Sequence, residues 1–352
     1  MNLHLTLDSL INYIGFTTGI LLGIGIILTA KQKKSAFFLG LFIVCYAIGI
    51  APNFLHDFNL NHPFLSKFTF ALNVNWLLFP LFYLYVQYTS ILKAKDLILP
   101  IGIALIGIFL EWITLFFFME NEVPIFYFFL TYFEVAFSIW VGVKIIRWIK
   151  KQKIEVLSQY SNAANKELNW SRNFVVIGLS FTLISLFIIF FDNDFDSVLA
   201  FINIVLLIWV ALKGVFQKEI DALPEKINKK EQNSNREELK SILKKTSNAI
   251  LANESYKKTD LTIVDVAKVI NIHPKKLSES INTVLQSNFN QYINSFRINE
   301  AKKLLLSQES NHLSIEGIGN EVGFQSKSTF FRAFKREMGM TPNAYKSSEN
   351  GE

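Results

Sequence analysis

The sequence predicts an all-α protein: a seven-helix transmembrane bundle followed by an all-α cytoplasmic domain, in which two helix-turn-helix units are joined by a long helix. Three observations predict this fold. Of the 352 residues, 51% are hydrophobic and 18% are charged, which is too apolar for an average soluble protein. The apolar residues gather in long runs within the first 217 positions. The residues that follow are polar and repeat a pattern of two short helices separated by a tight turn.

The apolar runs have the length that a membrane requires. A helix needs roughly 17–25 apolar residues to cross the hydrocarbon core of a bilayer. Each of seven runs meets or nearly meets this length, and the last two are the weakest candidates: Leu10–Ala30, Ala36–Leu55, Phe68–Tyr88, Leu97–Met119, Val123–Ile149, Phe174–Phe191 and Val198–Phe216.

The charges of the connecting loops predict the orientation. Loops with several basic residues alternate with loops that have one or none, as the positive-inside rule requires of seven spans with the N-terminus outside. The basic loops contain Lys31, Lys33 and Lys34, then Lys93 and Lys95, then the cluster from Arg147 to Arg172, whereas the others contain Lys67, Glu120 with Glu122, and the acidic break Asp192–Asp196. Everything after Lys213 is therefore expected in the cytoplasm.

A few polar side chains fall inside the apolar runs. Glu111 and Glu134 lie in the fourth and fifth runs, Asn73 and Asn75 in the third, and Asn203 in the seventh. An ionisable group at membrane depth costs roughly 2.5 kcal/mol or more unless it is protonated, paired or hydrated. One interpretation is an intramembrane signal site formed by Glu111, Glu134, Asn73 and Asn75. The other is hydrogen bonding between neighbouring helices, and the sequence leaves both open.

These patterns divide the chain into three parts. Residues 1–217 form the transmembrane domain, 218–253 a linker and connector helix, and 254–348 the polar domain. The connector helix, from about residue 236, has one apolar stripe. It could transmit a signal, form a dimer or pack on the domain that follows.

The second helix-turn-helix unit is expected over residues 314–338. Ser326 has the chemistry of an N-cap, and the helix that follows places Phe330 and Phe334 on one apolar stripe. Gly323 supplies the turn before this helix and Gly339 its C-terminal stop, after which Thr341-Pro342 forbids continuation.

The first unit, over about 260–285, repeats the same order of signals. Thr262 and Asp265 have the spacing of a capping box, and Asn271, which tolerates positive φ, stands where Gly323 stands in the second unit. His273-Pro274 opens the next helix, and His273 is expected to have a structural role as its cap. A linking helix over 288–306, which contains Arg297, would hold the two units at a fixed spacing.

Residues from about 255 to 346, about a quarter of the chain, resemble the DNA-binding domain of the AraC family. The resemblance is carried by DLTIVDVAKVINIHPKKLSESIN, by NFNQYINSFRINEAKKLLL and by the closing LSIEGIGNEVGFQSKSTFFRAFKREMGMTPNAYK, which is the most specific. Together with the apolar runs, it is similar to multi-span AraC-type regulators of bacteria. This implies a multi-pass protein of the bacterial inner membrane, with the membrane part as a sensor of an unidentified ligand.

The resemblance implies sequence-specific binding of double-stranded DNA in successive major grooves. The expected partners are DNA, the lipid bilayer, RNA polymerase and a second copy of the chain. The residues expected to face DNA, carried over position by position, are Lys275, Ser278, Glu279 and Asn282 in the first unit, and Lys327, Ser328, Phe331, Arg332 and Lys335 in the second. No catalytic residue, metal or cofactor is expected, since no Gly-rich phosphate loop, metal-ligand spacing or nucleophile elbow is found.

Some features depart from the family pattern. Glu279 can accept a bond from cytosine but repels phosphate, and Gly319 replaces the usual alanine at a cost of roughly 1 kcal/mol of helix stability. Residues 218–352 carry 21 basic and 17 acidic residues, a modest surplus for DNA binding. An alternative function is a transporter or membrane scaffold in which the helix-turn-helix domain binds a partner protein.

Overall fold

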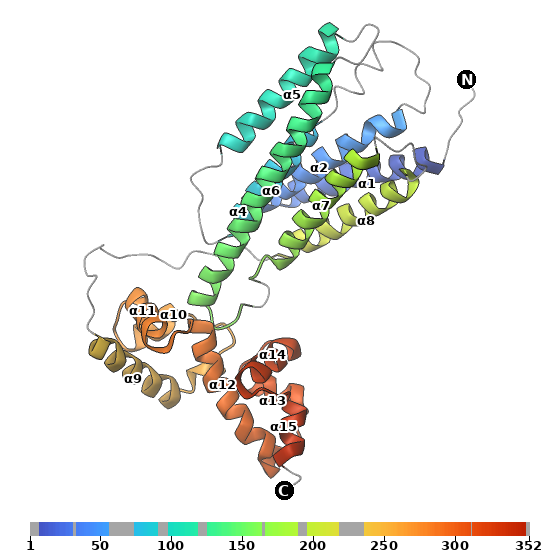
Figure 1. Cartoon of the computed structure of the whole chain (residues 1–352). Helices are drawn as coiled ribbons and strands as arrows, with labels where there is room; N and C mark the ends of the chain where they lie inside the picture. Colours follow the sequence, from blue (N-terminus) through green and yellow to red (C-terminus); the bar gives the residue numbers. More distant parts are fainter. Residues whose placement is uncertain are drawn as a thin grey trace. The chain divides into compact units, whose positions relative to one another are not determined.

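In a computed structural model of the chain, every regular element of the described residues is a helix (Figure 1). The described residues are 7–30, 33–55, 74–90, 98–118, 125–163, 166–188, 196–217, 236–310 and 312–349. The chain divides into two compact units, each treated by itself below. Unit 1 comprises Met1–Lys151 and Leu168–Asp221, and unit 2 comprises Gln152–Glu167 and Ala222–Glu352. Gln152–Glu167 thus belongs to unit 2, although it lies within the part, 1–217, that is predicted to be transmembrane.

Each of the seven apolar runs overlaps with a helix. In chain order the elements are α1 (Leu7–Thr29), α2 (Lys34–Leu55), η1 (Asn75–Leu77) with α4 (Leu78–Tyr88), α5 (Ile98–Phe118), α6 (Ile125–Gln159), α7 (Asn169–Ile188) and α8 (Asp196–Val215). The end of α6, from Gln152, belongs to unit 2. Among the described residues, three stretches are long and apolar enough to cross a membrane: Ser9–Thr29 of α1, Lys34–Pro52 of α2 and Phe128–Gln159 of α6. Shorter apolar helices cover Ile98–Thr114 and Phe201–Val215. Seven spans therefore stay a prediction.

Several residues on which the predicted topology depends lie outside the described residues. They are Lys31, Lys67, Lys93, Lys95, Glu120, Glu122, the acidic break from 192 to 195 and most of the linker, 218–235.

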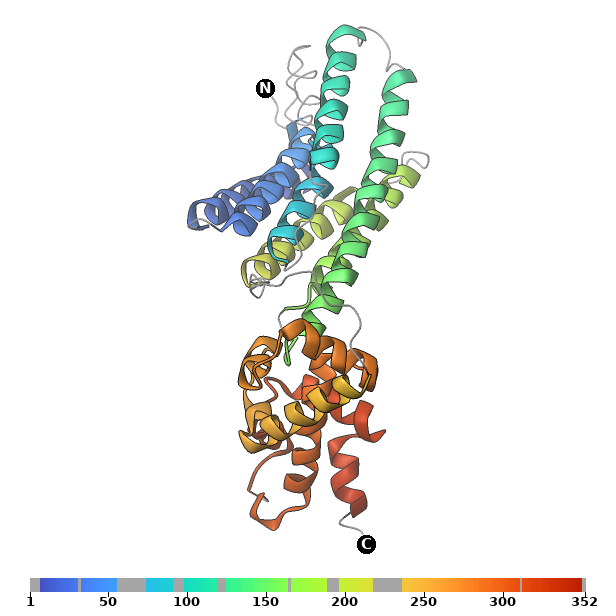
Figure 2. The same ribbon diagram turned by 90° about the vertical axis from the view of Figure 1, so that its left-hand side faces the viewer.

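Unit 1 buries one apolar cluster and exposes many large apolar side chains. The cluster includes Leu39, Phe42, Phe82 and Ile145. Helices α1 and α2 lie side by side (Figure 2) because glycines let their backbones meet. A Cβ atom added at Gly23 would lie 2.9 Å from the carbonyl oxygen of Gly40. The outer faces carry exposed side chains such as Leu21, Leu28, Ile98, Phe109 and Phe129.

Unit 2 contains the predicted short helices close to their expected ends. They are α9 (Arg236–Ala252), η2 (Ser255–Lys257), α10 (Ile263–Val269), α11 (Pro274–Leu285), α12 (Phe289–Leu306), η3 (Gln308–Ser310), α13 (Ile315–Glu321), α14 (Lys327–Met338) and α15 (Pro342–Glu349). Helix α15 was not predicted. Pro342 stops α14 from continuing, but its fixed φ and missing N–H also suit the first turn of a new helix.

Unit 2 has two apolar cores, one for each helix-turn-helix, and α12 contributes to both. Its first half supplies Phe289, Tyr292 and Ile293 to a core shared with α9, α10 and α11. Its second half supplies Ile298, Ala301 and Leu305 to a core shared with α13, α14 and α15. Figure 1 shows these two groups of helices at opposite ends of α12. The linking helix therefore fixes the two units through packing at both of its ends.

Candidate nucleic-acid interface

Helix α14 begins and ends as its sequence predicts. The Ser326 hydroxyl accepts a hydrogen bond from the backbone N–H of Thr329 at 3.3 Å, which makes Ser326 the N-cap. Gly339 ends the helix with φ of +76°, in the left-handed region that favours glycine. The helix buries Phe330, Ala333 and Phe334.

Helix α11 also has a side-chain N-cap, but the capping residue is a histidine instead of a serine. His273 is the N-cap, and its Nδ1 accepts a hydrogen bond from the backbone N–H of Lys275 at 3.0 Å. Burial and the charge of Lys275 lower the pKa of His273, which favours the neutral, accepting form. In the turn before it, Asn271 has the positive φ that the sequence predicts, +53°. The helix buries Leu277, Ser280 and Ile281.

The two helices share one register. Each has 12 residues and buries its fourth, seventh and eighth positions. Successive residues are about 100° apart around a helix, so the second, sixth and ninth positions project away from the core. We call these positions the reading face: they are Lys275, Glu279 and Asn282 in α11, and Ser328, Arg332 and Lys335 in α14.

The remaining predicted contact residues lie beside the reading face. Lys327 lies over the ring of Phe331, with Nζ 5.7 Å from the ring centre. Phe331 is half-buried and packs edge-on against Phe330. On α11, the Asn282 amide donates to the Ser278 hydroxyl at 3.4 Å, which orients both side chains. Phe331 therefore packs against the core more closely than the other residues predicted to contact DNA.

The two reading faces differ in charge. That of α14 carries Arg332 and Lys335, both exposed, with no acid among its three positions. That of α11 carries Glu279 at the position that Arg332 occupies in α14, beside one cation, Lys275. The neighbouring Lys276 points to the other side, where it forms an ion pair with Glu238 of α9.

Arg297 of α12 links several segments of unit 2, a role that is not predicted from the sequence. Its side chain is 1% exposed, and it donates to the carbonyl oxygens of Tyr256 at 2.7 Å and Lys258 at 2.8 Å. It also lies over the ring of Phe324, 5.5 Å from its centre, so it links the segment before the first helix-turn-helix unit to the second unit. Burial lowers its pKa to about 10, against the opposing effect of Asp260. The sequence feature that could have indicated this role is a basic residue in the middle of an amphipathic helix.

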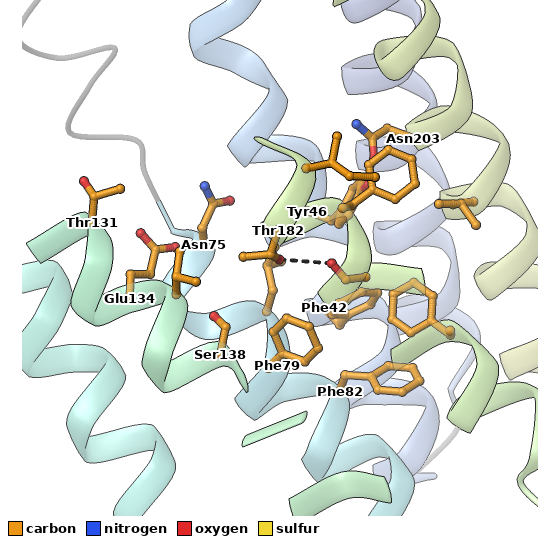
Figure 3. A pocket seen from close by; sticks show the side chains of 17 residues that line it. Phe42, Tyr46, Asn75, Phe79, Phe82, Thr131, Glu134, Ser138, Thr182 and Asn203 are labelled. Carbon is orange, nitrogen blue, oxygen red and sulfur yellow. Dashed lines mark hydrogen bonds between the residues drawn. The ribbon is translucent and has the colours of Figure 1, made fainter. Parts of the chain in front are cut away.

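The polar residues predicted as an intramembrane signal site do not all meet. Glu111 is buried and accepts a hydrogen bond from the Trp76 indole N–H at 2.9 Å, an interhelical bond of the kind the second interpretation expects. Glu134 and Asn75 line a cavity of unit 1 together with Asn203 (Figure 3). Asn73 lies outside the described residues.

The fold and caps of unit 2 define its C-terminal part as a double helix-turn-helix domain. Residues 266–348 match the family model described as a helix-turn-helix domain, which confirms the resemblance for this part of the chain. Parts of the chain are also similar to known regulators. Over 86 residues, 24% of this chain, the identity is 34% to the melibiose operon regulatory protein of Escherichia coli strain K12. Over 101 residues, 29% of this chain, it is 37% to the HTH-type transcriptional activator CfaD of Escherichia coli.

Each of these similarities covers less than a third of the chain. The chain spans 28% of the length of the melibiose regulator, 36% of CfaD and 31% of the raffinose operon transcriptional regulatory protein RafR of Pediococcus pentosaceus. No solved structure matches the chain.

Proposed function

We propose that the chain is a membrane-embedded transcription regulator that binds DNA sequence-specifically through α11 and α14. In this proposal the reading faces enter successive major grooves, about 34 Å apart along one face of the DNA. Unit 1 senses a signal, and RNA polymerase and a second copy of the chain are the expected protein partners. The observation that carries the proposal is the common register of the two capped helices.

The chemistry of the reading faces supports DNA as the partner. Arg332 is exposed and can donate two bonds to the O6 and N7 atoms of guanine. Lys335, one turn further on, can neutralise a phosphate. Asn282 can bond adenine with its amide, and Glu279 can accept from the amino group of cytosine. A protein-binding module would not need such groups at equivalent positions of two helices.

The composition of unit 1 supports a membrane location. Its helices α1, α2 and α6 are long and apolar enough to cross a bilayer. Exposed apolar side chains such as Leu28 (78%) and Ile98 (85%) would be costly in water but stable against lipid. Lys144, whose ammonium group lies 4.4 Å from the Trp140 ring centre, has the pairing expected at a membrane–water boundary.

The test of DNA binding uses the intact protein in lipid nanodiscs. Sequences are selected from random DNA, and affinities are measured for a selected and a scrambled duplex. The Arg332→Ala variant is expected to lose about 5- to 150-fold in affinity for the selected duplex, because a bidentate contact to guanine contributes about 1–3 kcal/mol. Arg236→Ala, which removes the same charge from the start of α9, is the matched control and should have little effect.

Two outcomes would refute the proposal. Absence of any enriched sequence, with equal binding of all duplexes, would favour the transporter or scaffold. A reporter fused after Glu352 that is active only outside the cytoplasm would separate the reading faces from DNA.

A further inference from the structure

A pocket of unit 1, which we call the lysine pocket, places two lysines beside aromatic side chains. Its volume of about 480 Å³ is within the size range of ligand sites. Residues of α1, α2 and α4 line it, together with the residue that precedes α2; they include Ile27, Lys33, Lys34, Phe37, Phe38 and Tyr88. Both lysines are exposed, as are the rings of Phe37 and Tyr88. Cations and apolar surface are therefore accessible side by side.

Contacts within unit 1 fix where the two lysines lie. Lys34 Nζ is 5.7 Å from the centre of the Tyr88 ring, and this ring stacks on Phe38 with 5.1 Å between the ring centres. The carbonyl oxygen of Lys33 accepts from the N–H of Phe37 at 3.1 Å, which places Lys33 at the start of α2. Both lysines therefore lie at the N-terminal end of α2 and line one pocket with the Tyr88 ring.

The charges of the lysine pocket favour an anion. Among the described residues that line it, two are basic and none is acidic. The pocket also lies at the N-terminus of α2, a helix of 22 residues, where the backbone dipole adds a partial positive charge. Phosphate oxygens can accept hydrogen bonds from lysines, and the phenol of Tyr88 is a further donor. A ligand that carries a cation of its own would be repelled by both ammonium groups.

The apolar part of the lining favours a lipid over a free anion. Ile27, Phe37 and Phe38 supply apolar surface that a phosphate ion cannot cover, and the ring of Phe37 is 44% exposed. A phospholipid joins a phosphate to acyl chains, so it matches both the cationic and the apolar side of the pocket. Basic pockets between the ends of membrane helices bind phospholipid headgroups in this way.

We propose that the lysine pocket binds an anionic phospholipid, with the phosphate at Lys33 and Lys34 and the acyl chains along Ile27 and Phe37. The inference rests on the proposed function for its membrane location, and it adds a lipid-specific site that joins α1, α2 and α4. The loop that contains both lysines is predicted on the cytoplasmic side, where anionic lipids attract basic groups.

The experiment compares phosphatidylglycerol, which is anionic, with phosphatidylcholine, which has the same phosphate but also carries a cation. The intact protein is purified in detergent, and the two lipids are titrated with identical acyl chains. Native mass spectrometry measures the affinity for the first bound lipid. Each lysine near an anionic headgroup contributes about fivefold, so phosphatidylglycerol should bind about 5- to 30-fold more tightly than phosphatidylcholine.

Matched pairs of lysines test whether the preference belongs to the lysine pocket. Lys33→Gln with Lys34→Gln should lower the preference for phosphatidylglycerol to below about twofold. The control is Lys150→Gln with Lys151→Gln, which removes two adjacent exposed lysines of α6 that do not line the pocket. It should leave the preference within about twofold of the wild type. Lys33→Arg with Lys34→Arg keeps both charges and should retain the preference, which separates loss of charge from loss of folding.

Two further measurements test the apolar half of the proposal. Phe37→Ala should weaken both lipids about two- to fivefold and preserve their ratio, because it removes apolar contact area but no charge. Inorganic phosphate at millimolar concentration should leave the binding of phosphatidylglycerol nearly unchanged. Displacement by phosphate would assign the pocket to a soluble anion and overturn the lipid proposal.

The other refuting outcomes are equally specific. Equal affinity for the two lipids, equal loss of preference in the two glutamine pairs, or loss of preference in the arginine pair would overturn the lysine pocket as a lipid site. Each of these results leaves the membrane location intact, because lipids still bind. Recovery of the chain from cells without detergent, with neither lipid bound, would refute both the site and the membrane location. The two failures are therefore distinguishable, and neither depends on DNA recognition.

Discussion

Replacing Gly323 by alanine probes the contact between the second helix-turn-helix unit and residues Tyr256 and Lys257, which precede the first unit. Gly323 has φ of +98°, which alanine rarely adopts. An added Cβ would lie 2.6 Å from the carbonyl oxygen of Lys257 and 2.9 Å from that of Tyr256. Both neighbours are backbone atoms, which cannot rotate away as a side chain could. The Tyr256 oxygen is also the acceptor for Arg297 at 2.7 Å, so the displacement would disturb the buried guanidinium.

The expected loss of stability has two parts. The left-handed conformation costs a residue with a Cβ roughly 1–2 kcal/mol. Weakening a hydrogen bond to a buried charge costs about 1.5–3 kcal/mol more. We therefore expect Gly323→Ala to lower the opening free energy of unit 2 by about 2.5–5 kcal/mol. Gly339→Ala is the matched control: Gly339 also has positive φ, but a Cβ there meets nothing within 4 Å, so about 1–2 kcal/mol should be lost.

Native-state hydrogen exchange of the intact protein in nanodiscs measures this difference. The opening free energies of α12, α13 and α14 are compared among the wild type and the two variants. The loss should be larger for Gly323→Ala than for Gly339→Ala. Equal losses would show that the contact with Tyr256 and Lys257 contributes nothing beyond the backbone conformation.

Three further predictions concern single side chains of unit 2. Gly319→Ala should destabilise α13 by about 1–3 kcal/mol, because an added Cβ would lie 2.8 Å from the ring of Phe330. Thermal denaturation measures this loss, and a gain in stability would contradict the packing. Because the pKa of His273 is lowered in the folded protein, the unfolded chain takes up the proton first as the pH falls. The free energy of unfolding should therefore decrease below about pH 6.5. His273→Asn can still cap α11 and should flatten this part of the plot of stability against pH. Glu279→Gln should raise the affinity for all duplexes about two- to fivefold in titrations at low salt, because it removes one repulsive charge near phosphate. Unchanged non-specific affinity would show that Glu279 lies far from the DNA backbone.

The parts of unit 2 that the sequence predicts well are those with local causes. Thr262 and Asp265 form the predicted capping box, Ser326 caps α14, and Asn271 and Gly323 have the positive φ values expected of their turns. Each of these depends on residues a few positions apart. The chemistry of such a segment therefore determines its conformation before any distant contact forms.

The features that the sequence did not predict depend on contacts between distant segments. Gly319 was counted as a departure that weakens a helix, but the structure shows that it makes room for Phe330. Ser161 lies in a polar stretch after an apolar run, and nothing nearby indicates that it bonds Arg297. The separation of Glu111 from the cavity of Glu134 likewise depends on helix packing. Periodicity gives the face of a residue but not its partner on another helix.

The charges of the two reading faces indicate that α11 and α14 would contribute differently to DNA binding. Arg332 and Lys335 give α14 two exposed cations, so α14 can supply both phosphate attraction and a base contact. The same register in α11 places an acid at the position of Arg332, so the attraction to phosphate is weaker there. Binding by α11 then depends more on its spacing from α14, which the buried contacts of Arg297 with Tyr256 and Phe324 help to fix.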